Sequence, residues 1–175
     1  HFKVSNGSGY DVACAGAELP LTYQLIDDTI NYTEIDFDPS FKQNLYFVYL
    51  NQKQSSVSAV EFYLKNAKKK KALVKKLNTI TESIVECASL NKFIGLIEDH
   101  EAAVAEHLSL KKVKDKHFSD FDGGIKSLGA WGGDFVLAAT NQDEKAVKAY
   151  FQEKGFETVV PYADMIFQEK VAETV

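Results

Sequence analysis

The chain has 175 residues, and its 20 basic residues, all lysines, face 25 acidic ones, for a formal net charge of −5. This length predicts one domain with a sizeable core, with or without an appendage. The acidic balance argues against a nucleic-acid partner or an anionic membrane surface, both of which need a basic excess. No apolar run is long enough to span a bilayer.

The first part of the chain predicts a short helix and three strands. Small residues from Val12 to Ala17 favour one or two helical turns. Residues 19–26 and 31–37 predict two strands around a polar turn. The continuous apolar run 44–50 predicts a buried strand.

The middle of the chain has helical periodicity. Apolar residues recur at helical spacing in 56–67, 73–87 and 90–108, which predicts three amphipathic helices. A lysine-rich connection follows the last of them.

The final part returns to strand patterns. Residues 124–128 and 135–139 flank a glycine-rich tip, and a helix over 144–154 is expected to stop at Gly155. A last strand is predicted over 156–160. The order of elements favours an α+β fold with helices on a mostly antiparallel sheet.

Two cysteines and the absence of arginine bear on chemistry. Cys14 and Cys87 have no metal or disulfide spacing, so we expect two small buried thiols in a reducing, cytoplasmic setting. Arginine is the usual bidentate clamp for phosphate and carboxylate groups. Without it, an anion would need lysine, backbone N–H groups, a metal or another chain segment.

The first candidate site is the segment around Asp11. Its neighbouring glycines allow close backbone approach, and the carboxylate could accept a proton from an attacking hydroxyl. The same residues also fit a capping box, with Ser8 as N-cap and Asp11 in the first helical turn. The local pattern alone favours the cap.

The second candidate is the tip between residues 126 and 135. Three glycines in five residues exceed what a tight hairpin needs, which suggests a backbone that a ligand or second loop approaches. A bulged hairpin with Trp131 packed nearby explains the pattern equally well.

Other polar clusters are weaker candidates. His100 and His107 share a helix face, but the second histidine of a zinc-protease motif is missing, and no metal site is expected. The lysines at 68–71, 75 and 76 favour a solvated helix junction over a nucleic-acid patch.

Taken together, three segments resemble the GHMP superfamily of small-molecule kinases. GSGYDVACA (7–15) is similar to the stretch holding its catalytic aspartate, and KSLGAWGGDF (126–135) to its glycine-rich third motif. LIEDHEAAVAEHLSL (96–110) is similar to the helix before that motif. The Gly-Tyr-Asp form looks most like a bacterial subgroup related to mevalonate and phosphomevalonate kinases.

The resemblance implies roles for particular residues. Asp11 would be the catalytic aspartate, beside Ser8 and Gly9. His100 and Glu101 could line the acceptor pocket, because the matching helix in related kinases faces the substrate. Lys126 and the tip would help to place the ATP phosphates through Gly129, Ala130, Trp131, Gly132 and Gly133. Trp131 and Asp134 depart from the usual small residues, so a normal fit of the phosphates is in doubt at these two positions.

The resemblance also implies a domain organisation. Residues 1–40 would be the strand-rich tail of an N-terminal domain, and 41–175 a GHMP-type C-terminal domain with a ferredoxin-like antiparallel sheet covered by helices. The superfamily's first motif and its phosphate-binding Gly-Leu-Gly-Ser-Ser loop are absent. The chain is therefore expected to be the C-terminal part of a kinase, inactive alone and without bound ATP or Mg²⁺, and its partners would be the missing half and a small-molecule substrate.

A second class of function stays open at this point. The hairpin-helix-strand order is shared with ferredoxin-like regulatory domains, which bind small ligands without chemistry. Asp11 in its Ser-Gly loop distinguishes the two, since a binding module does not need it.

Overall fold

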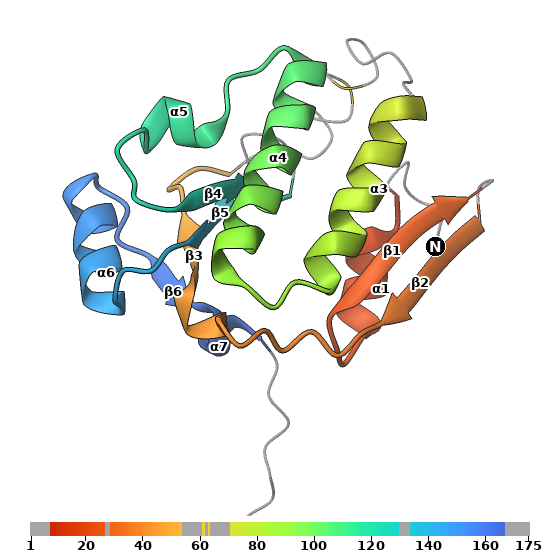
Figure 1. Cartoon of the computed structure of the whole chain (residues 1–175), viewed down its shortest axis with the longest axis horizontal. Coiled ribbons are helices and arrows are strands. Elements are labelled where there is room, and N and C mark those ends of the chain that lie inside the picture. Colours follow the sequence, from red (N-terminus) through yellow and green to blue (C-terminus); the bar gives the residue numbers. More distant parts are fainter. Residues whose placement is uncertain are drawn as a thin grey trace, which may run out of the picture. The chain divides into compact units, whose positions relative to one another are not determined.

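The computed structural model describes residues 8–26, 29–53, 61, 63, 71–129 and 134–166. They belong to two compact units, one built from residues up to Asp38 and the other spanning Pro39–Ile166. Both units mix helices with antiparallel strands, so the chain has an α+β fold (Figure 1). Among the described residues, no helix has the length and apolarity needed to cross a membrane.

Unit 1 consists of one short helix and a two-stranded ribbon. Helix α1 spans Tyr10–Gly16, and strands β1 (Leu21–Ile26) and β2 (Thr29–Glu34) pair antiparallel. The predicted second strand, 31–37, was placed too late in the chain. Register explains the difference, because Leu21 at the start of β1 pairs with Glu34, and Pro20 before it has no N–H to extend the ladder.

The ribbon has one apolar and one polar face. Side chains alternate between faces along a strand, and one face carries leucine, tyrosine and isoleucine side chains while the other carries mainly threonine, glutamine and asparagine. None of the described residues of unit 1 is buried. The prediction of a buried Cys14 is therefore wrong, because α1 has no core to enter, whereas Cys87 of unit 2 is buried as predicted.

Unit 2 contains a four-stranded antiparallel sheet in the order β4-β5-β3-β6. Strand β3 (Leu45–Tyr49) pairs with β5 (Phe135–Ala139) and with β6 (Val159–Pro161), and β4 (Gly124–Ser127) pairs with β5. The antiparallel sheet and the buried apolar strand near 44–50 are confirmed. Residues 156–158 lie outside the last strand, which the sequence predicted too early.

Helices α4 to α7 of unit 2 contact the sheet, and α3 packs against α4. Helices α3 (Lys71–Val85) and α4 (Leu90–Leu108) lie side by side in opposite directions, and α6 (Glu144–Glu153) packs through Val147 and Phe151 (Figure 1). Two short helices, α5 (Val113–His117) and α7 (Tyr162–Met165), and the 3₁₀ turn Lys42–Asn44 had no counterpart in the sequence prediction. The helix predicted over 56–67 lies largely outside the described residues.

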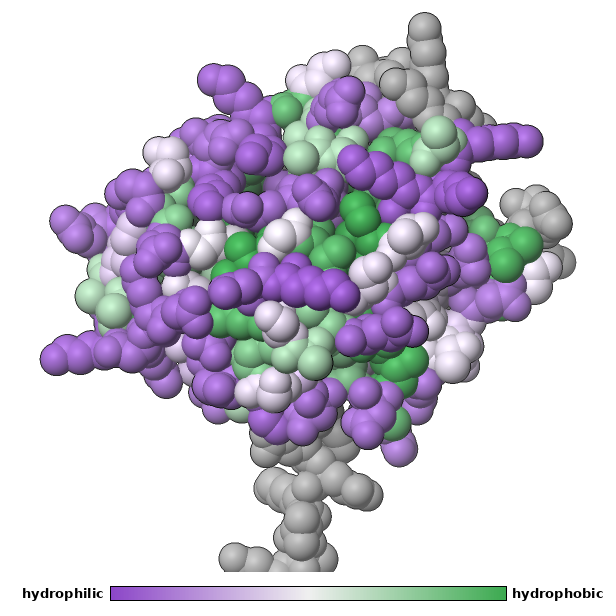
Figure 2. All heavy atoms as spheres, in the orientation of Figure 1, coloured by the Kyte–Doolittle hydropathy of each residue, from purple (hydrophilic) through white to green (hydrophobic). Residues whose placement is uncertain are grey.

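Local signals set the helix ends. The Asp143 carboxylate accepts a hydrogen bond from the Ala146 N–H at 2.8 Å and caps α6. Gly155 has a φ of 85° just beyond α6, as its predicted role as a stop requires. Hydrophilic side chains cover much of the outward surface of α3 and α4, with smaller hydrophobic areas between them (Figure 2).

Candidate functional site

The approach of α4 to β4 positions the first group of candidate residues. A Cβ added to Gly124 would lie 3.0 Å from the Ile97 Cδ1 atom, so glycine lets the strand come close to the helix at this point. One helical turn further along α4, Glu101 lies beside Ser127 at the end of β4. Helix and strand therefore run in the same direction, toward the glycine-rich tip.

Glu101 fixes the last residue of β4. Its side chain is fully buried, with 0% exposure. The Ser127 N–H donates to Glu101 Oε2 at 3.2 Å, and the Ser127 hydroxyl lies 3.0 and 2.9 Å from the two carboxylate oxygens. A buried carboxylate is tolerated when such bonds replace its hydration. Glu101 thus ties the base of the tip to α4.

Lys126 and His100 flank this carboxylate. The Lys126 ammonium donates to the Ser127 carbonyl oxygen at 3.0 Å. Burial lowers the pKa of Lys126, and the Glu101 charge opposes that shift. Burial, followed by the Lys126 charge, lowers the pKa of His100 to about 4. At neutral pH the His100 side chain is therefore a neutral imidazole.

This cluster predicts a particular pH dependence of stability. Because the pKa of folded His100 is about 4 and its ordinary value is 6.5, the unfolded chain binds a proton there first as pH falls. That contribution costs stability between about pH 6.5 and pH 4 and is absent at pH 7. Urea unfolding of His100→Gln should show a shallower loss of stability over that window than the wild type. Identical slopes for both proteins would contradict this reading of His100.

The glycine-rich tip begins at Gly129. The Leu128 N–H donates to the Phe135 carbonyl at 3.0 Å and closes the hairpin below the tip. Gly129 has a φ of 68°, and a Cβ added there would meet nothing within 4 Å. Backbone conformation, not crowding, therefore favours glycine at this position. Ala130, Trp131, Gly132 and Gly133 lie outside the described residues.

The Asp11 segment belongs to unit 1. Gly9 is the N-cap of α1 with a φ of 79°, and no side chain caps the helix. The alternative reading of Ser8 as a capping-box N-cap is wrong, because the left-handed glycine starts the helix one residue later. The Tyr23 hydroxyl donates to the Ser8 carbonyl and holds the loop against β1. Asp11 is exposed in the first turn.

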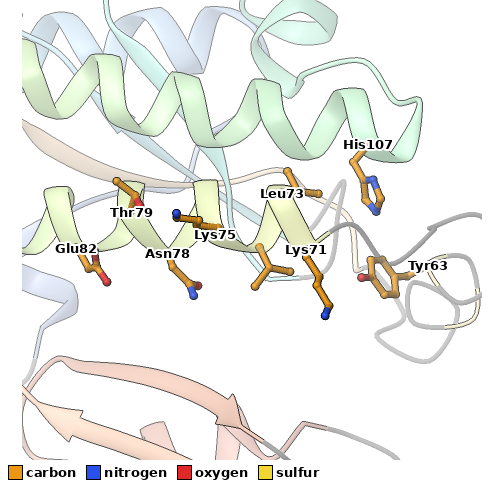
Figure 3. Close-up of a pocket in the computed structure, with 9 residues that line it drawn as sticks. Tyr63, Lys71, Leu73, Lys75, Asn78, Thr79, Glu82 and His107 are labelled. Carbon is orange, nitrogen blue, oxygen red and sulfur yellow. The ribbon is translucent and has the colours of Figure 1, made fainter.

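An open hollow of about 730 Å³ lies along α3, and sequence reasoning missed it (Figure 3). Its lining includes lysines of α3 and His107 of α4, but neither His100 nor Glu101. The sequence showed these lysines only as a solvated row. His107 joins that lining only because α4 packs beside α3, which no local pattern encodes.

The two units thus hold separate groups of candidate residues. Unit 1 contains the exposed carboxylate of Asp11, which follows a Ser-Gly loop held by the hydrogen bond from Tyr23 to Ser8. Unit 2 presents a glycine-rich hairpin tip whose base is fixed by a buried carboxylate.

Comparisons with known proteins add a similarity of fold. No protein-family model matches the sequence, and no curated protein matches it. The crystal structure of a Lin0012 protein from Listeria innocua is similar, with a TM-score of 0.59 and 15% identity over 75% of this chain. The chain covers 41% of the length of that protein. At this identity the similarity shows the fold alone.

Proposed function

We propose that this chain is the C-terminal part of an ATP-dependent, cytoplasmic small-molecule kinase of the GHMP superfamily. The observation that carries the proposal is the hairpin at Lys126–Gly129. The lysine and first glycine of the third-motif resemblance come at the end of β4, and Glu101 holds the base of the tip. Phosphoryl transfer asks a protein mainly for such fixed positioning around the phosphates.

In this proposal Asp11 acts on the acceptor. The acceptor hydroxyl oxygen forms a bond to the γ-phosphorus of ATP, the bond from that phosphorus to the β-phosphate oxygen breaks, and Asp11 takes the hydroxyl proton. Exposure of Asp11 and the anchoring of Ser8 by Tyr23 suit this role, since the carboxylate must reach a ligand from a fixed loop. The acceptor would be an alcohol or phosphate of a small metabolite, such as a mevalonate-like compound or a sugar.

Among the described residues, no group of three or more histidine, cysteine, aspartate or glutamate side chains could hold a metal ion by itself. The proposal assigns Mg²⁺ and the main phosphate-binding loop to an N-terminal half of the same polypeptide, while the hairpin that contains Lys126 helps to place the phosphates. The 175-residue chain alone is expected to be inactive.

The test is a phosphorylation screen of the longer polypeptide with ATP and a panel of small alcohols, sugars and phosphorylated alcohols. Transfer of the γ-phosphate to a panel member is expected, with none from the 175-residue chain alone. Saturable binding of a metabolite to the longer polypeptide without any ATP turnover would instead favour a non-catalytic regulatory domain. Phosphorylation catalysed by the short chain alone would contradict the division of roles.

A further inference from the structure

The hollow along α3 has a lining unlike an ordinary solvated helix face. Lys71, Lys75, Asn78 and Glu82 follow one another at helical spacing, so their side chains form a row along α3. Figure 3 shows this row, with Lys71 at the end nearest His107 and Glu82 at the other. The hollow is thus cationic at one end and anionic at the other.

The two lysines lack counter-ions in the part of the chain that the structure describes. The ion pairs there involve other lysines, at positions 112, 114, 148 and 154. Like charges four residues apart on a helix repel one another. An anion placed between Lys71 and Lys75 would relieve that repulsion and gain two charge-assisted hydrogen bonds.

His107 supplies an independent sign of a ligand. Its ring extends from the end of α4 beside the start of α3, and the Tyr63 ring lies next to it, with the two ring centroids 6.3 Å apart (Figure 3). The Nδ1 atom of His107 is buried and has no hydrogen-bond partner among the described residues. A buried polar atom left unpaired costs about 1–3 kcal/mol, which a ligand atom at this end of the hollow would offset.

We propose that this hollow binds a small organic anion, with a phosphate or carboxylate group on a short carbon chain. Lys71, Lys75 and His107 bind the anionic group, Leu73 contacts the carbon chain, and Glu82 accepts a hydrogen bond from a hydroxyl at the far end. Lysines supply the charge because the chain has no arginine. The inference concerns binding and does not depend on phosphoryl transfer.

The test titrates the 175-residue chain with n-butyl phosphate, pentanoate and n-butanol, using calorimetry and the ring-nitrogen NMR signals of His107. At least one of the two anions should bind saturably and shift the His107 signals, whereas butanol should not bind. Lys71→Gln and Lys75→Gln should each weaken binding about 10-fold or more, as loss of a charge-assisted hydrogen bond implies.

Lys76→Gln is the matched control, since Lys76 is an exposed lysine on the same helix outside the hollow. It should leave the affinity within about twofold, because an exposed charge that points away from the ligand is screened by water and salt. Equal losses in all three variants would mean diffuse charge attraction and overturn the proposal. Failure of both anions to bind would overturn it as well. ATP is absent, so the kinase proposal does not affect either outcome.

Discussion

Replacing Glu101 with alanine is expected to lower the free energy of unfolding of unit 2 by about 3–5 kcal/mol. The Glu101 side chain is fully buried, and both of its carboxylate oxygens are bonded to Ser127. Removing it leaves the Ser127 N–H and hydroxyl without their partner, leaves Lys126 without a nearby anion, and opens a cavity. Urea or guanidinium unfolding measures the loss.

Two variants make this measurement specific. Glu106→Ala changes an exposed glutamate on the same helix and should stay within about 0.5 kcal/mol of the wild type. Glu101→Gln keeps the shape and one acceptor oxygen, so its loss should fall between the other two. If the free energy of unfolding of Glu101→Ala lies within about 1 kcal/mol of the wild-type value, the carboxylate does not hold the base of the tip.

In the longer polypeptide, Asp11→Asn is expected to lower kcat by about 10²–10⁴-fold, the usual contribution of a general base. Asn keeps the size of the side chain but cannot take the proton of the acceptor hydroxyl. Asp11 is exposed, and none of the described residues of its unit is buried, so stability and nucleotide affinity should change little. Steady-state kinetics with a nucleotide-binding titration separates the two effects.

Asp36→Asn is the control for this substitution. Asp36 is another exposed aspartate of unit 1, outside the Ser-Gly loop, and the chemical change is the same. Its kcat should equal that of the wild type. Full turnover by Asp11→Asn would remove Asp11 from the chemistry and leave it as a surface residue of α1.

Periodicity located the elements that have strong local signals. The helix predicted over 90–108 matches α4 at both ends, and the strand over 135–139 matches β5. In both segments the apolar residues are numerous and follow the spacing expected for a single element packed on a core. The end of α6 before Gly155 could also be predicted, because a glycine after a helical segment favours a left-handed cap.

The misplaced last strand shows where such reasoning fails. Pro161 suggested an end to the strand, yet it pairs with Tyr46 as the last residue of β6. Strand β6 lies at the edge of the sheet, where a proline without N–H is tolerated. The edge position of β6 depends on the order of all four strands in the sheet, and this order cannot be predicted from one segment.

The candidate site could be predicted only in part, because it too depends on contacts between segments that are distant in sequence. The resemblance pointed to Lys126, His100 and Glu101. The hydrogen bond from the Ser127 hydroxyl to the Glu101 carboxylate could not be predicted, because it joins residues 26 positions apart. Helical spacing could not tell a carboxylate that faces a ligand from one that is buried under a strand. The hollow beside His107 depends likewise on two helices meeting.

The most direct test of the central claim is a double-mutant cycle on kcat/KM in the longer polypeptide, with Asp11→Asn and Gly129→Ala. Gly129 has a φ of 68°, so alanine there should strain the tip without a clash. If Asp11 and the glycine-rich tip both serve the phosphoryl-transfer step, the double variant should be much less impaired than the product of the single losses. Losses that multiply would contradict a common step.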